Sequence, residues 1–450
     1  MKRFLLLALC ALFAGTAGAR TLYVDAKRPN NNGNGLSAKK AKKTIQAAIN
    51  IAKKGDTILV YPGSYAPITA KNKKITIKSV KGNAKTKIVK PAATNRKVAL
   101  AQLGKPYTVF IDTHGAKGNS GIYSKGTKTQ LSGFLLDGMN RTVGSFGELI
   151  GVSGGTVKSC IIQRLGKRYA DTFGGFASYD RATAAVNSSL EACIIRNNFG
   201  YLAPSEALAV GSGSEPAAET GSTFNRCVFQ NNEGYTGIVK GSLRNCLLFG
   251  NTVRDELFDR STLINCTVAK NTSECSYPPF RFSYKSKYYD CILWNNYVRE
   301  PLMKKTVYGY DYYADASKSF WLGWRSTSET TFTVPDDDTD DASDVEVTED
   351  TIANYWPDYV RVENSWEEPF PGKKVLHNVD AGNTYKNTDK TNKNPKFVNA
   401  PKGNYKLKKG SPFIDKGKLT AAQKKLVGSK DLAGKKRIRG KANDRGCYEY

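Results

Sequence analysis

A nine-residue pattern recurs along the middle of the chain and limits its possible folds more than any other feature. It starts at an aliphatic or aromatic residue, has cysteine at the fourth position and ends at an asparagine. The clear copies occupy residues 190–198, 224–232, 243–251, 263–271 and 288–296. Residues 157–162 form a degraded earlier copy, and residues 131–136, with Phe134 at the cysteine position, form a still earlier one.

The spacing of the cysteines indicates how these copies are arranged. From Cys160 to Cys291, the successive cysteines at the repeat position are 33, 34, 19, 20 and 25 residues apart. A period near 20 residues with one short aliphatic strand is typical of one coil of a parallel β-helix. We therefore expect an all-β fold, a single-stranded right-handed parallel β-helix (solenoid) of about ten coils. The asparagines would form a second ladder, because asparagine at a bend tolerates a left-handed backbone and can bond to the next asparagine.

The cysteines support stacking rather than a disulfide framework. Eight remain beyond residue 19, an even number that suggests disulfides in a secreted protein. Because six share one repeat position, we expect buried thiols in the core. Cys275 and Cys447 lie off this ladder, and the pairing of these two stays open. The chain has no CxxC motif and only two histidines, His114 and His377, which argues against a zinc site.

The two ends of the chain are strongly basic. Residues 21–100 contain 18 Lys or Arg and two acids, and residues 400–450 contain 15 and four, whereas residues 101–399 are nearly neutral. Such ends favour an anionic polysaccharide or cell-surface glycan as partner. A lysine-rich solvated surface is the alternative. Nucleic acid is disfavoured, since no recognition motif is present.

The N-terminus resembles a signal peptide. Lys2 and Arg3 precede an apolar stretch that ends in small residues at 17–19. This predicts cleavage near Ala19 and a secreted, periplasmic or cell-surface protein with no transmembrane segment, which we expect to be a monomer. We divide the chain into a signal peptide (1–19), an N-terminal cap with the coils (20–300), an aromatic and acidic insertion (301–375) and the last coil with a basic closing segment (376–450).

An amphipathic segment near the N-terminus would cover the first coil. Residues 43–53 predict a helix with Ile45, Ala48, Ile49 and Ala52 on one face. A β-helix needs such a cap, because an open terminal coil would pair with other chains.

Motifs at both ends resemble bacterial proteins of the pectate-lyase-like parallel β-helix superfamily. At the N-terminus these are residues 23–25, 35–37, 43–49, 55–58 and 60–65. At the C-terminus residues 394–398, 404–407, 410–415, 431–434 and 444–449 resemble the closing segment called the choice-of-anchor Q type. The resemblance implies an exported β-helix. The group includes polysaccharide lyases, glycosidases and many proteins of unknown role, so the resemblance by itself assigns no single activity.

Long intervals between coils are the natural place for a substrate groove, since the coils are committed to packing. Aromatic rings beside arginines suit sugar faces and carboxylates. The residues that we predict to bind substrate are Arg168, Tyr169, Tyr179, Arg181, Tyr277, Arg281 and Tyr284. The alternative is that these aromatic residues only hold long loops against the coils.

A mixed cluster between two tight repeats is the candidate catalytic site. Lyases of the group that the chain resembles use Lys or Arg as base and calcium held by acids. By that resemblance, Arg254, Asp255, Asp259 and Arg260 would be catalytic, and Asp255, Glu256 and Asp259 would hold calcium. The competing interpretation is a surface turn with ion pairs of little energetic weight.

The insertion at 301–375 breaks the repeat. It combines Tyr- and Trp-rich stretches with nine acids between residues 336 and 350, which lack the spacing of a calcium loop. We expect a flexible acidic loop behind an ordered aromatic part; a glycan-stacking patch is the alternative. Taken together, the sequence predicts a protein that binds, and by hypothesis cleaves by β-elimination, an anionic polysaccharide. A non-catalytic surface, adhesion or structural protein is the alternative.

Overall fold

The protein is described by a computed structural model. The described residues are 18–70, 73–89, 107–112, 129–141, 148–166, 168–169, 178–179, 181–186, 188–200, 221–234, 237–253, 256–273, 282–298, 302–307, 310–315, 320–326, 332–335, 342–345, 373–374, 383–388 and 393–450. Most of the predicted signal peptide, residues 1–17, lies outside them. Among the described residues, no helix has the length and apolar character needed to cross a bilayer.

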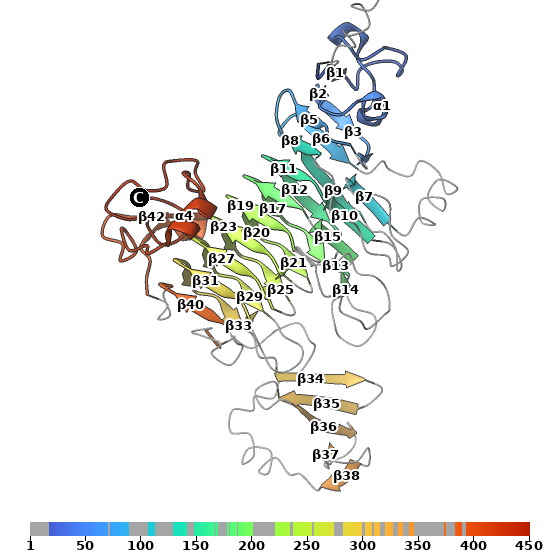
Figure 1. Cartoon of the computed structure of the whole chain (residues 1–450). Helices are drawn as coiled ribbons and strands as arrows, with labels where there is room; N and C mark the ends of the chain where they lie inside the picture. The colour runs from blue at the N-terminus through green and yellow to red at the C-terminus, as the bar shows by residue number, and fades with distance from the viewer. Residues whose placement is uncertain are drawn as a thin grey trace, which may run out of the picture.

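Short parallel strands wind into successive coils around one core (Figure 1). The first sheet contains β1 (Thr21–Val24), β2 (Thr57–Val60), β5 (Thr76–Ser79), β8 (Gln130–Ser132), β11 (Thr156–Lys158), β16 (Ser189–Glu191), β19 (Thr223–Asn225), β23 (Ser242–Arg244), β27 (Thr262–Ile264), β31 (Lys287–Tyr289) and β40 (Thr384–Lys386). The second contains β3 (Gly63–Tyr65), β6 (Thr86–Val89), β9 (Leu135–Arg141), β12 (Ile161–Leu165), β17 (Ile194–Arg196), β20 (Val228–Gln230), β24 (Leu247–Phe249), β28 (Thr267–Ala269) and β32 (Ile292–Trp294).

The remaining side of the coils changes along the molecule. In the N-terminal half it is a sheet of β4 (Ile68–Thr69), β7 (Tyr107–Asp112), β10 (Glu148–Ser153) and β15 (Arg181–Val186). Later coils have one sheet of β18 (Phe199–Gly200), β21 (Glu233–Gly234), β25 (Thr252–Val253), β29 (Thr272–Ser273), β33 (Tyr297–Val298) and β39 (Lys373–Lys374), and another of β22 (Ile238–Val239), β26 (Phe258–Asp259) and β30 (Ser283–Tyr284). This strand order confirms the predicted parallel β-helix.

The register of the first sheet stacks one apolar position through the whole molecule. Paired in order, these residues are Leu22, Ile58, Ile77, Leu131, Val157, Leu190, Phe224, Leu243, Leu263 and Tyr288. All of them are buried in a single core. The column ends where the ring of Tyr288 stacks on that of Tyr385 in β40, with centroids 5.0 Å apart. A slip of one residue would turn the whole apolar set outward, so the core fixes the register.

The predicted cysteine ladder is present at the corner between the first two sheets. The six cysteines at the repeat position are buried and free, with Phe134 before them at the same position. They are Cys160, Cys193, Cys227, Cys246, Cys266 and Cys291. After the last coil Thr388 continues the ladder, because its hydroxyl accepts a bond from the backbone N–H of Cys291 at 3.2 Å. Cys447 is also free and buried, and Cys275 lies outside the described residues.

The predicted asparagine ladder lies at the next corner. Each side-chain amide donates to the Oδ1 of the asparagine in the following coil, from Asn198 through Asn232, Asn251 and Asn271 to Asn296, over 2.7–3.0 Å. That same Oδ1 also accepts the backbone N–H of the preceding ladder residue, over 3.1–3.2 Å. Each corner therefore satisfies its own buried polar groups, as a dry interior requires.

One detail of that prediction is wrong. The left-handed residue of each corner is not the ladder asparagine but the residue before it, for example Asn197 with φ 52° and Lys270 with φ 54°. The cysteine corner follows the same rule, since Asn245, Asn265 and Asp290 have φ between 50° and 52°. The ladder residue itself must keep its side chain inward to reach its neighbour, and the preceding residue makes the bend.

The N-terminal cap forms as predicted. Helix α1 (Ile45–Ile51) begins after Thr44, whose hydroxyl accepts a bond from the backbone N–H of Ala47. Its buried residues Ile45, Ala48 and Ile49 join the core of the first coils.

The insertion contains an antiparallel sheet that the sequence analysis did not predict. It is formed by β34 (Leu302–Val307), β35 (Tyr310–Asp315), β36 (Phe320–Ser326), β37 (Phe332–Pro335) and β38 (Ala342–Val345) (Figure 1). Strand β38 falls within the acidic tract and pairs with β37. The rest of that tract lies outside the described residues.

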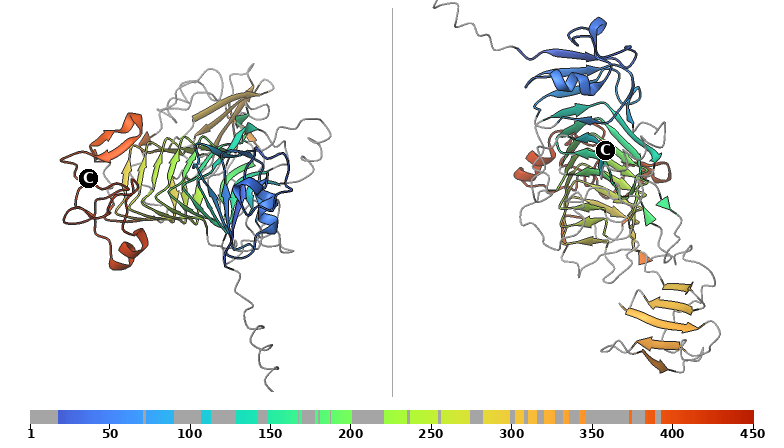
Figure 2. Two further views of the ribbon diagram at one scale, coloured as in Figure 1. Left: turned by 90° about the horizontal axis from the view of Figure 1, so that it is seen from above. Right: turned by 90° about the vertical axis from the view of Figure 1, so that its right-hand side faces the viewer.

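Residues 393–450, here called the C-terminal segment, pack beside the coils (Figure 2). The segment contains β41 (Phe397–Asn399), η3 (Ala400–Lys402), β42 (Asn404–Leu407) and α4 (Ala421–Val427). Phe397, Tyr405 and Phe413 join a second core that includes Leu247, Ala269 and Ile292 on the outer face of the second sheet. These three strand residues are at most 2% exposed, so this part of the sheet is covered on both faces.

Candidate functional site

The predicted catalytic cluster is only partly described. Arg254 and Asp255 lie outside the described residues. Asp259, the last residue of β26, is half-buried, and both its oxygens contact the guanidinium of the adjacent Arg260 at 3.0–3.2 Å. Glu256 is half-buried just before β26. Within the described ranges no three His, Cys, Asp or Glu residues are grouped to hold a metal. Calcium binding through Asp255, Glu256 and Asp259 therefore stays a prediction.

The residues predicted to bind substrate fall into three places. Arg168 and Tyr169 form β13, which pairs antiparallel with β14 (Ser178–Tyr179), so that Arg168 stands opposite Tyr179. Arg181 begins β15 and pairs with Glu148. Tyr277 and Arg281 lie outside the described residues.

Tyr284, a predicted substrate residue within the described part of the chain, lies beside the predicted catalytic cluster. It ends β30, in register with Asp259 on the neighbouring coil. The Nζ of Lys285 lies 4.9 Å from the centroid of its ring, a cation–π contact.

In the C-terminal segment, the lysines lie on the surface and the acidic side chains lie beneath it. All twelve lysines between residues 400 and 450 are exposed, whereas each of the four acids, Asp415, Asp431, Asp444 and Glu449, is buried or half-buried. Because the acids point inward, the segment presents a cationic surface with no exposed carboxylate side chain among residues 400–450.

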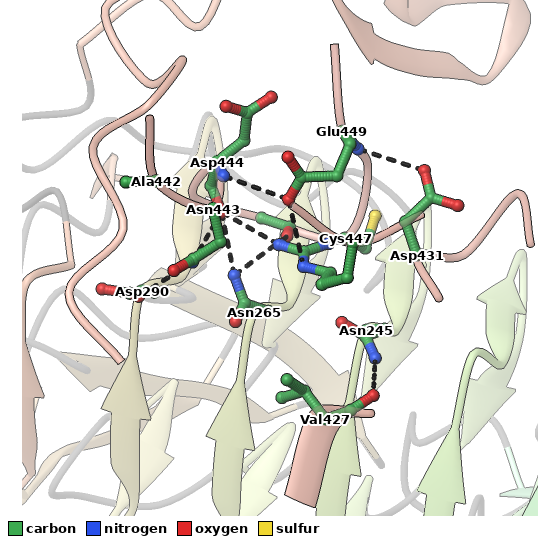
Figure 3. A network of polar contacts seen from close by, with 12 residues as sticks. Asn245, Asn265, Asp290, Val427, Asp431, Ala442, Asn443, Asp444, Cys447 and Glu449 are labelled. Carbon is green, nitrogen blue, oxygen red and sulfur yellow. Dashed lines mark hydrogen bonds and ion pairs between the residues drawn. The ribbon is translucent and has the colours of Figure 1, made fainter. Parts of the chain in front are cut away.

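Three of the buried acids, Asp431, Asp444 and Glu449, lie close to one another in the segment (Figure 3). Arg437 is bonded among them. The Nη2 of Arg437 donates to the carbonyl oxygens of Asp444 at 2.9 Å and Gly446 at 2.7 Å, and its Nε lies 3.2 Å from Oε1 of Glu449. Asp431 accepts the backbone N–H of Glu449 at 3.1 Å. Burial raises the pKa of Glu449 to about 8 in spite of the nearby arginine, and raises the pKa of Asp444 as well. The C-terminal motifs seen in the sequence are thus structural.

Three left-handed corner residues of the coils bind this segment. Asn245 donates to the carbonyl oxygen of Val427 at 2.8 Å, and Asn265 to that of Asp444 at 2.9 Å (Figure 3). Asp290 accepts bonds from the backbone N–H of Lys418 at 2.8 Å and the side chain of Asn443 at 3.1 Å. The corners that shape the coils therefore also position the segment.

A groove with a volume of about 660 Å³ lies between the outer face of the second sheet and the C-terminal segment. Its aromatic wall contains Phe249, Tyr405 and Tyr448, and Lys270 and Lys402 also line it. None of the described residues that line it carries a carboxylate. No sequence pattern predicted this groove, because one side comes from residues 194–270 and the other from residues 400–448, and no local pattern encodes how such distant segments dock.

No family model matches the chain, and no curated protein matches it in sequence. Among solved structures, a rhamnogalacturonan lyase is similar with 13% identity and a TM-score of 0.45, over 91% of this chain and 98% of the other. The pectate lyase Pel9A is similar with 14% identity and a TM-score of 0.37, over 97% of each chain. Both are parallel β-helix proteins.

The fold is a parallel β-helix. That statement rests on the parallel sheets of the chain itself. At these identities and TM-scores, neither lyase assigns an activity, a substrate or a site residue to this protein.

Proposed function

We propose that this β-helix is a secreted protein that binds an anionic polysaccharide along its C-terminal segment. The observation that supports the proposal is the separation of charge in that segment, with twelve exposed lysines outside and four acids inside. A surface with one sign of charge attracts a polymer of the opposite sign, and carboxylated sugars supply such a polymer. The segment is anchored to the coils, so its lysines are held on a fixed base.

Binding of purified mature protein to polygalacturonate tests the proposal, with dextran as the neutral control. We expect binding to polygalacturonate alone, weakening as the salt concentration rises from about 50 to about 200 mM, because exposed charges are screened. Changing Lys424, Lys425, Lys435 and Lys436 to Gln should lower the affinity. The matched control changes four exposed lysines of the N-terminal cap, Lys39, Lys40, Lys53 and Lys54, to Gln. Equal losses in the two variants would contradict binding along the C-terminal segment, and no binding at all would favour the non-catalytic structural or adhesion alternative.

Cleavage by β-elimination is a second candidate. The observation that favours it is the register of β26 and β30, which sets Tyr284 beside Asp259 and the neighbouring Arg260. Calcium, held by acids of this cluster, would neutralise the uronate carboxylate. An ultraviolet assay on uronic-acid polysaccharides, with calcium and with chelator, tests this candidate. A calcium-dependent rise in absorbance from unsaturated products would support it, and a flat trace on every substrate would exclude it for that panel.

A further inference from the structure

We propose that the groove beside the C-terminal segment is a subsite for a carboxylated sugar in an anionic oligosaccharide. The proposal rests on the proposed function, and it moves the recognition of single sugar rings from the long loops, where the sequence placed it, to the outer face of the second sheet. It concerns binding and not cleavage.

The aromatic wall of the groove is held rigidly. The rings of Phe249 and Tyr405 have centroids 5.1 Å apart, and Tyr405 packs edge-to-face on Phe397 at 5.0 Å. Gly403, with φ 73°, lies so close to Phe249 that a Cβ there would be 3.4 Å from the end of the ring. Phe249 remains half-buried, so part of its apolar face is available. A fixed ring with a free face is a suitable base for the apolar face of a sugar.

Polar groups around this wall match a sugar with a carboxylate. Gln230, half-buried on β20, brings an amide that can both donate to and accept from hydroxyl groups. Lys270 and Lys402 are exposed and bring two positive charges, and the turn that carries Lys402 is fixed by a bond from its backbone N–H to Oδ1 of Asn399 at 3.3 Å. Because none of the described residues that line the groove is a carboxylate, these charges are not neutralised by that lining. An anionic ligand is therefore favoured over a neutral one.

The same lining explains why the groove should bind without cleaving. Its described residues include no Asp, Glu or His, and so supply neither the paired carboxylates of a glycosidase nor the acids that would hold calcium. Burial raises the pKa of Tyr405 to about 12, which keeps its hydroxyl protonated at neutral pH. The volume of about 660 Å³ falls within the range of about 300–1,000 Å³ of small-molecule sites.

Calorimetric titration of the full-length mature protein with tetragalacturonate tests the inference, with maltotetraose as the neutral probe. The variant Lys270→Gln/Lys402→Gln should bind tetragalacturonate at least about tenfold more weakly, because each lost charge-assisted contact costs about that factor. The matched control Lys39→Gln/Lys40→Gln removes the same charge from exposed positions of the N-terminal cap, outside the groove, and should stay within about threefold of the wild type.

A second pair of variants replaces Gln by Glu, which changes the charge but hardly changes the shape of the side chain. Gln230→Glu adds a carboxylate inside it and should weaken tetragalacturonate binding. Gln423→Glu adds the same charge in the first turn of α4, where glutamate preserves the capping box with Thr420, and should not. Equal effects within each pair would overturn the groove inference. The proposed function would still stand in that case, provided that the protein binds polygalacturonate. A wild-type protein that bound neither polygalacturonate nor tetragalacturonate would overturn both.

Discussion

The side-chain amide of Asn245 donates a hydrogen bond to the carbonyl oxygen of Val427, 182 residues later, at 2.8 Å. Asn245 forms a left-handed corner of one coil, and Val427 ends helix α4 of the C-terminal segment. The corner thus has two roles, since it turns the chain between sheets and holds a segment that arrives from the far end of the sequence.

The neighbouring corner gives a test of this anchoring. We expect Asn265→Ala to destabilise the protein by about 2–3 kcal/mol, because it removes one buried hydrogen bond to the carbonyl of Asp444, which keeps its bond from Arg437, and places alanine in a left-handed backbone. Urea denaturation measures the change. Asn197→Ala is the control, since Asn197 is exposed with the same φ of 52° and bears only the backbone cost. Equal losses in the two variants would show that the bond to Asp444 contributes nothing.

The asparagine ladder should be costly to interrupt. In Asn251 the amide donates to Asn271 and to the carbonyl of Phe229, and the Oδ1 accepts two bonds from Asn232. Replacing Asn251 by Ala leaves these buried partners unsatisfied, and we expect a loss of more than about 2 kcal/mol in guanidinium denaturation. Asn231→Ala, at the exposed left-handed position of the preceding coil, should cost about 1 kcal/mol. A ladder variant as stable as this control would contradict the role of the ladder.

The buried thiols should be unreactive in the native protein. Burial raises the pKa of Cys160, Cys227 and Cys266 well above the ordinary thiol value, and that of Cys447 to about 12. All seven described cysteines are at most 1% exposed, so the reagent cannot reach them, and iodoacetamide should label none of the seven until a denaturant is added. Mass spectrometry of the digested protein identifies each labelled site. Rapid native labelling of a ladder cysteine would show that its coil opens.

Glu449 should make the stability of the C-terminal segment depend on pH. Its pKa is raised from 4.5 to about 8 by burial, so the folded protein holds a proton that the unfolded chain releases. Its stabilising contribution is therefore complete below about pH 4.5 and is lost as the pH rises through about 8. Urea denaturation of the wild type and of Glu449→Gln should diverge above neutral pH, with the variant less sensitive. Parallel pH profiles would contradict a protonated Glu449.

The predicted catalytic cluster gives a test of activity. If the protein is a calcium-dependent lyase that uses this cluster, the double variant Asp255→Ala/Asp259→Ala should lose at least about 99% of the rate, because the acids proposed to hold calcium are removed. Release of unsaturated products measures the rate. Glu191→Ala, an acid paired on the surface with Lys158 and Arg226, is the control and should keep it. An unchanged rate in the double variant would remove the cluster from the mechanism.

The coils could be predicted from the sequence, but the docking of the C-terminal segment on them could not. The cysteine and asparagine ladders could be predicted because each repeat places the same residue at the same point of the coil. The bond between Asn245 and Val427 could not, because nothing local relates residues 182 positions apart. A signal was nonetheless present: β24 reads Leu-Leu-Phe with its first two residues buried, whereas β17 and β20 end in a polar residue. A strand apolar on both faces must be covered by something.

The outer face of the second sheet is covered by residues that are synthesised last. The inward residues of the coils pack on one another and can do so during synthesis. The outward residues Leu247, Ala269 and Ile292 stay uncovered until residues 397–447, which are made late, pack on them. A chain truncated before that point would expose an apolar patch that promotes aggregation with other chains. The docked C-terminal segment therefore makes protection from aggregation depend on complete synthesis, because a truncated chain lacks the residues that cover this apolar surface.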